Sequence, residues 1–167
     1  LKAQEDVKIV AYVHDLLPIT HPHLFPEKDL IKHANRLRNI KECADAILVN
    51  SNFTREQFEE HFGADSVRSV LEIGSPASAE RRLTNRQRNG FVAIGTIEPR
   101  KNYNWLVKAW LDFATKNSDF VQGERLTIFG KPGWLLEERR EELLALVESS
   151  DSVEIITGAS DELVQER

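Results

Sequence analysis

A glycine-led loop that contains two cations carries the strongest chemical signal in this sequence. Residues 95–102 read Gly-Thr-Ile-Glu-Pro-Arg-Lys-Asn, with a buried-strand pattern before them and a helical pattern after them. Gly95 permits a tight turn and the close approach of a ligand. Arg100 and Lys101 stand just before a helix N-terminus, whose free N–H groups favour anions. The loop predicts either a diphosphate site or two solvated charges. It is not a Walker loop, because no second glycine precedes the lysine.

A histidine and an aspartate directly follow another apolar strand, residues 7–13. His14 can donate a hydrogen bond to a phosphate or a sugar hydroxyl, and Asp15 can orient it or bind a hydroxyl itself. The alternative is a structural histidine beside an aspartate that caps the loop, and the sequence alone favours this alternative.

Residues 130–134, Gly-Lys-Pro-Gly-Trp, form a third strand-to-helix turn. Lys131 is a candidate anion ligand, although turn geometry alone explains the segment better, and Trp134 is expected to pack as a lid on the core. His21 and His23 lie close enough in sequence to share a metal ion, but no third ligand accompanies them, so no metal site is predicted.

The elements that must position these residues alternate along the chain. Short apolar runs predict strands at 7–13, 46–49, 67–73, 91–94, 126–129 and 153–156. Amphipathic spacing predicts helices at 29–43, 52–62, 103–116 and 135–148, with another starting at Asp161. Ser51 and Asn102 are the expected N-caps, and three prolines make 18–27 a loop. Strands that alternate with helices predict an α/β fold with parallel sheets, whose ligands bind at the carboxyl ends of the strands.

Two helices are expected to turn specific side chains inward. The inner face predicted for helix 103–116 contains Leu106, Ala109, Trp110 and Phe113. For helix 135–148 it contains Leu136, Leu143 and Val147. These spacings follow the period of an α-helix.

Composition narrows the class of protein. The 167 residues are 41% hydrophobic and 29% charged, which suits one compact domain or two small lobes. The net charge of −5 argues against nucleic-acid binding, and the lone Cys43 excludes a disulfide framework. The turn-prone, arginine-rich stretch 76–89 predicts a linker between lobes at 1–75 and 90–167. Because the chain lacks methionine and begins at Leu1, we expect a piece of a longer protein or a processed start.

Four segments, taken in order, resemble a known family. They are 14–18, 44–54, 95–102 and 128–134, and together they resemble the group 1 (family four) retaining glycosyltransferases. The similarity is greatest to the bacterial mannosyl- and rhamnosyltransferase-like members that build surface polysaccharides.

The resemblance implies two Rossmann-like lobes of the GT-B type, truncated at both ends. Residues 1–75 would be the last part of the N-terminal acceptor lobe, and 90–167 the first part of the nucleotide-sugar lobe. Lys101 would be the phosphate-binding lysine, and His14 the histidine that contacts the transferred sugar or its phosphate. Asp15, Gly95, Thr96, Arg100 and Lys131 would line the substrate site. Thr96 stands where the family often has an arginine, so Arg100 would supply the second charge.

The implied reaction transfers a hexose, with retention, from a GDP-, UDP- or dTDP-linked sugar to a saccharide or lipid-linked acceptor. No metal or other cofactor is expected, because lysine and arginine bind the diphosphate. The implied location is the cytoplasm, at the inner membrane face if the acceptor is a lipid.

The sequence leaves other functions and binding partners to consider. A non-catalytic or partner-binding module on the same scaffold is the alternative, because the family's glycine loop and glutamate pair are expected outside this sequence. Open sheet edges make a second copy of the chain a candidate partner. A dehydrogenase is disfavoured, because no Gly-x-Gly-x-x-Gly follows a strand.

Overall fold

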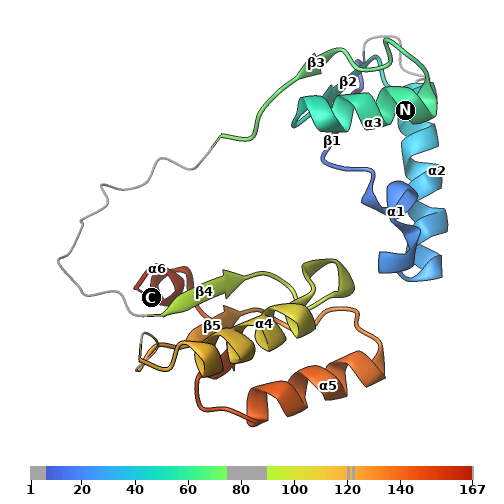
Figure 1. The fold of residues 1–167 in the computed structure, drawn as a ribbon. Coiled ribbons are helices and arrows are strands. Elements are labelled where there is room, and N and C mark those ends of the chain that lie inside the picture. The colour runs from blue at the N-terminus through green and yellow to red at the C-terminus, as the bar shows by residue number, and fades with distance from the viewer. Residues whose placement is uncertain (1–6, 75–89, 120, 122, 167) are drawn as a thin grey trace. The chain divides into compact units, whose positions relative to one another are not determined.

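The chain divides into two compact units, Leu1–Arg81 and Arg82–Arg167, in a computed structural model that describes residues 7–74, 90–119, 121 and 123–166. Each unit has its own parallel sheet of three strands (Figure 1). The predicted α/β fold with parallel sheets is therefore confirmed, and it has the architecture of Rossmann-like lobes. The predicted linker, 76–89, lies outside the described residues.

The first unit is built around a short central strand. Its strands are β1 (Val10–Val13), β2 (Ala46–Val49) and β3 (Ser69–Val70), in the order β1-β2-β3. Its helices are α1 (Leu17–Thr20), the 3₁₀ turn η1 (Pro22–Leu24), α2 (Glu27–Cys43) and α3 (Asn52–Phe62).

Alternation along β2 creates the core of the first unit. Ile47 and Val49 are buried, and they pack with Leu37 of α2 and Phe58 of α3. The Ser51 hydroxyl accepts a hydrogen bond of 3.1 Å from the backbone N–H of residue 54, so the predicted N-cap of α3 is confirmed.

The proline-rich stretch was predicted wrongly as a loop. Residues 18–27 contain most of α1 and all of η1. Pro18 and Pro22 lie in the first turns of these segments, where the missing N–H has no helical partner to lose. Two of the three prolines therefore start short helices here, and Pro26 is the N-cap of the long helix α2.

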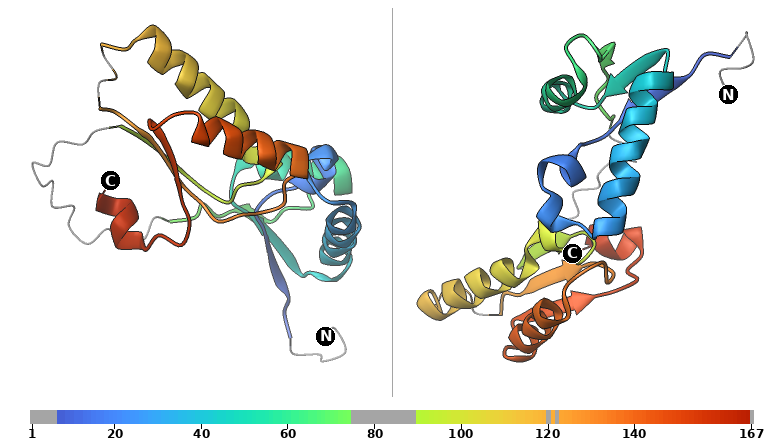
Figure 2. Two further views of the ribbon diagram at one scale, coloured as in Figure 1. Left: turned by 90° about the horizontal axis from the view of Figure 1, so that it is seen from below. Right: turned by 90° about the vertical axis from the view of Figure 1, so that its right-hand side faces the viewer.

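The second unit follows the same plan. Its strands are β4 (Phe91–Ile94), β5 (Leu126–Phe129) and β6 (Val153–Ile156), in the order β4-β5-β6. Its helices are η2 (Pro99–Lys101), α4 (Tyr103–Lys116), α5 (Glu137–Glu148) and α6 (Asp161–Glu166). Figure 2 shows α4 and α5 side by side against the sheet, as their contacts require.

The central strand β5 is buried along its whole length, and the helices cover it. Val107 and Trp110 of α4 and Leu143 of α5 join the same core. The predicted inner faces are partly wrong, because the side chains of Phe113 and Leu136 are 38% and 59% exposed. The buried face of α4 instead contains Tyr103, Val107 and Trp110. This face is rotated about the helix axis by about one residue relative to the predicted face.

The start of α4 is confirmed, but its expected cap is not formed. Asn102 takes the left-handed conformation, with φ of 51°, and its side chain makes no capping hydrogen bond. The turn η2 ends at this residue, and asparagine tolerates the left-handed region better than most residues. Asn102 is therefore the left-handed residue that joins η2 to α4.

Among the described residues, the first strand of each sheet has a neighbouring strand on one side only. Val10 of β1 and Ile94 of β4 are 59% and 62% exposed. Among the described residues, no helix combines the length and apolar character needed to cross a membrane.

Candidate functional site

The loop that follows β4 is joined to the loop that follows β5 by main-chain hydrogen bonds. The N–H of Ile97 donates to the carbonyl oxygen of Lys131 over 3.0 Å, and the N–H of Gly133 donates back to Ile97 over 3.0 Å. The carboxyl ends of two neighbouring parallel strands thus form one surface, which is where α/β sheets bind ligands.

Two glycines allow this joint, the hydrogen-bonded contact between the loops that follow β4 and β5, to form. A Cβ atom on Gly130 would lie 2.1 Å from the carbonyl oxygen of Gly95, so no side chain fits there. Gly95 has φ of 148°, which other residues rarely adopt, and its N–H donates to the carbonyl of Phe129 over 2.9 Å. The predicted importance of Gly95 for a tight turn is therefore borne out by the backbone.

Replacing Gly130 by alanine is expected to destabilise the second unit by about 1–3 kcal/mol, because the new methyl group meets backbone atoms that cannot rotate away. Urea unfolding followed by tryptophan fluorescence measures this, since all three tryptophans, at 105, 110 and 134, lie in the second unit. Lys116→Ala is the control in the same unit, because this exposed side chain pairs with Asp112 on the surface of α4. Equal midpoints for the two variants would disprove the close approach.

Lys101 folds back over Gly95. Its Cε and Nζ atoms lie 3.3 and 3.7 Å from the position that a Cβ on Gly95 would occupy. The space left by the missing side chain is therefore used by the lysine. Within the described residues, no carboxylate lies within ion-pair distance of this ammonium group, so its charge is available to a ligand.

Arg100 differs from Lys101 because a carboxylate already balances its charge. Its Nε lies 2.5 Å from Oε1 of Glu98, and the two side chains are 36% and 22% exposed. A guanidinium group has five donors in all, so the terminal nitrogens of Arg100 still have donors beyond this pair. This pairing of Arg100 with Glu98 was not predicted from the sequence.

Tyr103, the first residue of α4, also contacts this loop, and it was not identified from the sequence. Its hydroxyl donates a hydrogen bond of 3.0 Å to the carbonyl oxygen of Gly95, and the side chain is 4% exposed. Burial, and then the nearby charge of Glu98, raise the pKa of the Tyr103 hydroxyl above its ordinary value. The phenol therefore stays protonated and remains a donor at neutral pH. An aromatic residue at the first position of the helix was the available signal.

The remaining predicted residues of this unit line the joint less closely. The methyl group of Thr96 lies 2.5 Å from where a Cβ on Gly133 would stand, so the two residues are packed together. Lys131 contributes its backbone carbonyl to the joint, while its side chain is exposed. Trp134 is 37% exposed, so the prediction that it forms a lid on the core is wrong.

A cavity of about 470 Å³ adjoins the same two loops. Ile97, Pro132 and Gly133 line it from the loops, and Leu143 and Val147 line it from α5. Its surface is mainly apolar, which suits a flat ring better than a phosphate.

The first unit carries the other predicted pair. His14 is exposed at the carboxyl end of β1, with its ring edge-on to Tyr12 at a centroid distance of 4.9 Å. The Oδ1 atom of Asp15 accepts a hydrogen bond of 3.1 Å from the N–H of Leu17. Asp15 thus caps the turn that begins α1, as the structural alternative expected, while the His14 ring faces solvent.

His33 of α2 is a half-buried neighbour of this loop that sequence reasoning took for a surface residue. Burial lowers its pKa from the ordinary value of 6.5, the Asp15 carboxylate opposes that shift, and Arg36 adds to it. The Nε2 atom is buried and has no hydrogen-bond partner among the described residues. The folded unit therefore holds this imidazole mainly neutral at pH 7.

Acidification is expected to weaken the first unit through His33. The folded state binds this proton more weakly than the unfolded state, so stability falls as the pH drops through 6.5. Hydrogen exchange of the Val49 and Phe58 amides, measured at about pH 7 and about pH 5.5, reports this loss. His33→Gln should flatten the pH dependence, whereas the exposed His61→Gln should leave it unchanged. An identical slope in His33→Gln would contradict the assignment.

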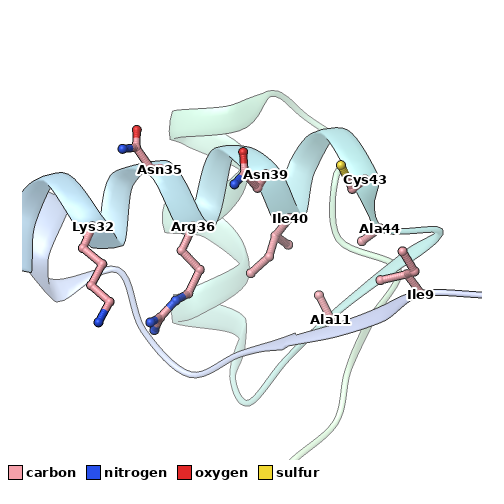
Figure 3. Close-up of a pocket in the computed structure, with 9 residues that line it drawn as sticks. All are labelled: Ile9, Ala11, Lys32, Asn35, Arg36, Asn39, Ile40, Cys43 and Ala44. Carbon is pink, nitrogen blue, oxygen red and sulfur yellow. The ribbon is translucent and has the colours of Figure 1, made fainter. Parts of the chain in front are cut away.

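A second cavity lies between β1 and α2 in the first unit (Figure 3). Its volume is about 640 Å³, and Figure 3 shows Lys32, Arg36 and Ile40 pointing from α2 toward β1. None of the site residues predicted from the sequence lines it. Within the described part of the chain, no three histidine, cysteine or acidic side chains are grouped to hold a metal ion.

Comparison with known proteins gives a coarse answer. No family model matches the sequence. The chain is 27% identical over 175 aligned residues to two sequences of the serotype-specific mannosyltransferase WbdA of Escherichia coli. The alignment covers 92% of this chain but only 21% and 20% of the relatives, so the chain spans about a fifth of their length. Over most of its sequence, the chain is therefore similar to one part of a bacterial mannosyltransferase.

Proposed function

We propose that this chain forms part of a hexosyltransferase, and that its second unit binds the diphosphate of a nucleotide-sugar donor. The observation that carries the proposal is the Lys101 ammonium group, which has no ion-pair partner among the described residues and lies over Gly95 where two parallel strands end. The similarity to a mannosyltransferase supports a glycosyl donor over other anions.

The chemistry follows from the charge of the leaving group. When the glycosidic bond of the donor breaks, the sugar becomes oxocarbenium-like and the diphosphate gains negative charge. Lys101 and the N-terminus of α4 stabilise this charge more in the transition state than in the ground state, which lowers the barrier. Arg100 supplies a second cation through its terminal nitrogens while Nε stays with Glu98. The sugar is transferred with retention of its configuration.

The rest of the donor is placed by the neighbouring surfaces. The cavity that shares Ile97 and Gly133 with the loop accepts the nucleobase against its apolar wall. Lys131 and Thr96 border the diphosphate. GDP-, UDP- and dTDP-linked hexoses are the candidate donors, and the lysine and arginine replace a metal ion.

The acceptor belongs to the first unit in this proposal. The exposed His14 ring contacts the transferred sugar or its phosphate, and Asp15 supports it by holding the turn at Leu17. The acceptor is a saccharide or a lipid-linked sugar of a surface polysaccharide. The reaction takes place in the cytoplasm, at the inner membrane face when the acceptor is a lipid.

A titration tests the donor site directly. The ¹⁵N-labelled 167-residue chain is titrated with GDP-mannose, UDP-glucose and dTDP-rhamnose, and amide shifts are expected at Thr96, Lys101 and Asn102. Lys101→Ala should abolish these shifts, while Lys116→Ala, whose ammonium pairs with Asp112 at 2.8 Å, should not. Saturable shifts elsewhere with none in the 95–102 loop would overturn the proposed site.

A partner-binding module is the second candidate, and the open edges of both sheets favour it. Exposed Val10 and Ile94 lie on strands that have one unpaired side each within the described residues. Edge strands of this kind readily add a further strand. Sedimentation velocity of the chain distinguishes this function: self-association without any response to nucleotide sugars would support the module over the donor site.

A further inference from the structure

We propose that Tyr103 is a positioning residue, whose hydroxyl fixes the Gly95–Thr96 peptide so that the Thr96 N–H faces the anion as a third donor. The inference rests on the proposed function, because the anion is the donor diphosphate. It assigns a role to Tyr103 and to the backbone of Thr96, in addition to the side chain of Lys101.

The hydroxyl of Tyr103 has one specific partner. It donates to the Gly95 carbonyl over 3.0 Å, and it lies 3.1 Å from the position of a Cβ on Gly95, on the same side as the Lys101 side chain. The ring itself is part of the core with Val107 and Trp110. A phenylalanine would fill that core equally well. The hydroxyl is therefore explained by the carbonyl and not by packing, because a buried hydroxyl costs stability unless it is hydrogen-bonded.

The direction of the Thr96 N–H follows from the planarity of the peptide bond. In a trans peptide, the carbonyl of one residue and the N–H of the next point in opposite directions. The Gly95 carbonyl is held toward the interior by Tyr103 and faces Gly130. The Thr96 N–H therefore points away from the interior and toward the open side of the loop.

The neighbouring N–H groups support the same orientation. Those of Gly95 and Ile97 are both used by the adjacent strand and loop, donating to Phe129 and Lys131. In extended backbone, successive N–H groups alternate in direction, so that of Thr96 faces the other way. It has no acceptor among the described residues, in contrast to the donors on either side of it. The Lys101 side chain lies over Gly95, the residue before this N–H. An unused backbone N–H and an ammonium group are both suitable donors to phosphate oxygens.

The test compares Y103F with T127V in the labelled 167-residue chain. Each variant removes one buried hydroxyl donor from the second unit, and Thr127 donates to Glu154 over 2.8 Å, in the sheet and not in the loop. Without ligand, Y103F should shift the Gly95 carbonyl carbon and the Thr96 amide, while the Val107 and Trp110 amides stay in place and show an intact core. T127V should leave the Gly95 and Thr96 signals unchanged.

Binding of inorganic pyrophosphate then tests the anion role. We expect Y103F to bind it about fivefold more weakly, as the loss of one ordering hydrogen bond allows, and T127V to bind as the unaltered chain does. Unchanged Gly95 and Thr96 signals, or equal affinity in Y103F and the unaltered chain, would overturn the inference while leaving the donor site standing. Failure of the unaltered chain to bind pyrophosphate would instead contradict the proposed function, and the anion role of Thr96 with it.

Discussion

Lys101→Ala is expected to lower kcat by about 10²–10³ in an active transferase that contains this chain. The reason is that the substitution removes the preorganised positive charge that would stabilise the leaving diphosphate. The fold should be unaffected, because the lysine side chain is exposed at the end of η2 and takes no part in the core of the second unit. Steady-state kinetics with the preferred nucleotide sugar measures the effect.

Lys116→Ala provides the matched control for this prediction. Lys116 is a lysine at the far end of α4, where it pairs with Asp112 on the helix surface. This variant should keep full turnover. Lys101→Arg should recover part of the lost rate, because the charge returns with a different shape. Turnover close to that of the unaltered enzyme in Lys101→Ala would refute the role of this lysine in charge stabilisation.

His14→Ala is expected to lower kcat by about tenfold to a hundredfold while the affinity for free nucleoside diphosphate stays nearly unchanged, which is the size of a lost hydrogen bond to a charged or reacting group. The reason is its place: the ring is exposed at the end of β1 in the first unit, whereas the loop proposed to bind the diphosphate belongs to the second. Kinetics and isothermal titration calorimetry together separate the two effects.

His61→Ala is the control for His14, because its ring lies on the surface of α3 and its Nδ1 is 2.8 Å from the backbone carbonyl of Gln57. It should leave both kcat and nucleotide affinity unchanged. A His14→Ala variant that loses nucleotide affinity but retains its turnover would contradict this prediction, and it would exclude the contact with the transferred sugar in favour of the phosphate.

Local patterns in the sequence were sufficient to predict most of the elements. The run Leu-Thr-Ile-Phe before Gly130 identifies β5, and a serine followed by an amphipathic run identifies the start of α3. Prolines were harder to interpret, because the same residue breaks a helix in its interior and begins one in its first turn. Residues 18–27 were therefore assigned to a loop, although the chain there forms α1 and η1.

The candidate site was only partly predictable because its contacts are formed between loops. The sequence marked Gly95 for a tight turn, which agrees with its φ of 148°, while the expectation that Lys101 binds a diphosphate stays a prediction. It could not show that Arg100 is paired with Glu98, since the shape of the turn brings them together. The Tyr103 hydroxyl was also missed, because its partner is a main-chain carbonyl. Backbone carbonyls are present in every residue and leave no trace in a sequence.

The joint between the two loops consists of main-chain atoms, and this affects how the protein can change. Ile97, Lys131 and Gly133 hold the loops together through N–H and carbonyl groups that every amino acid except proline possesses. Substitutions at the side chains of 98–101 can therefore alter the local charge without redirecting the chain. Such a frame allows the charge of the loop to change by small steps, while the two glycines that close it remain under constraint.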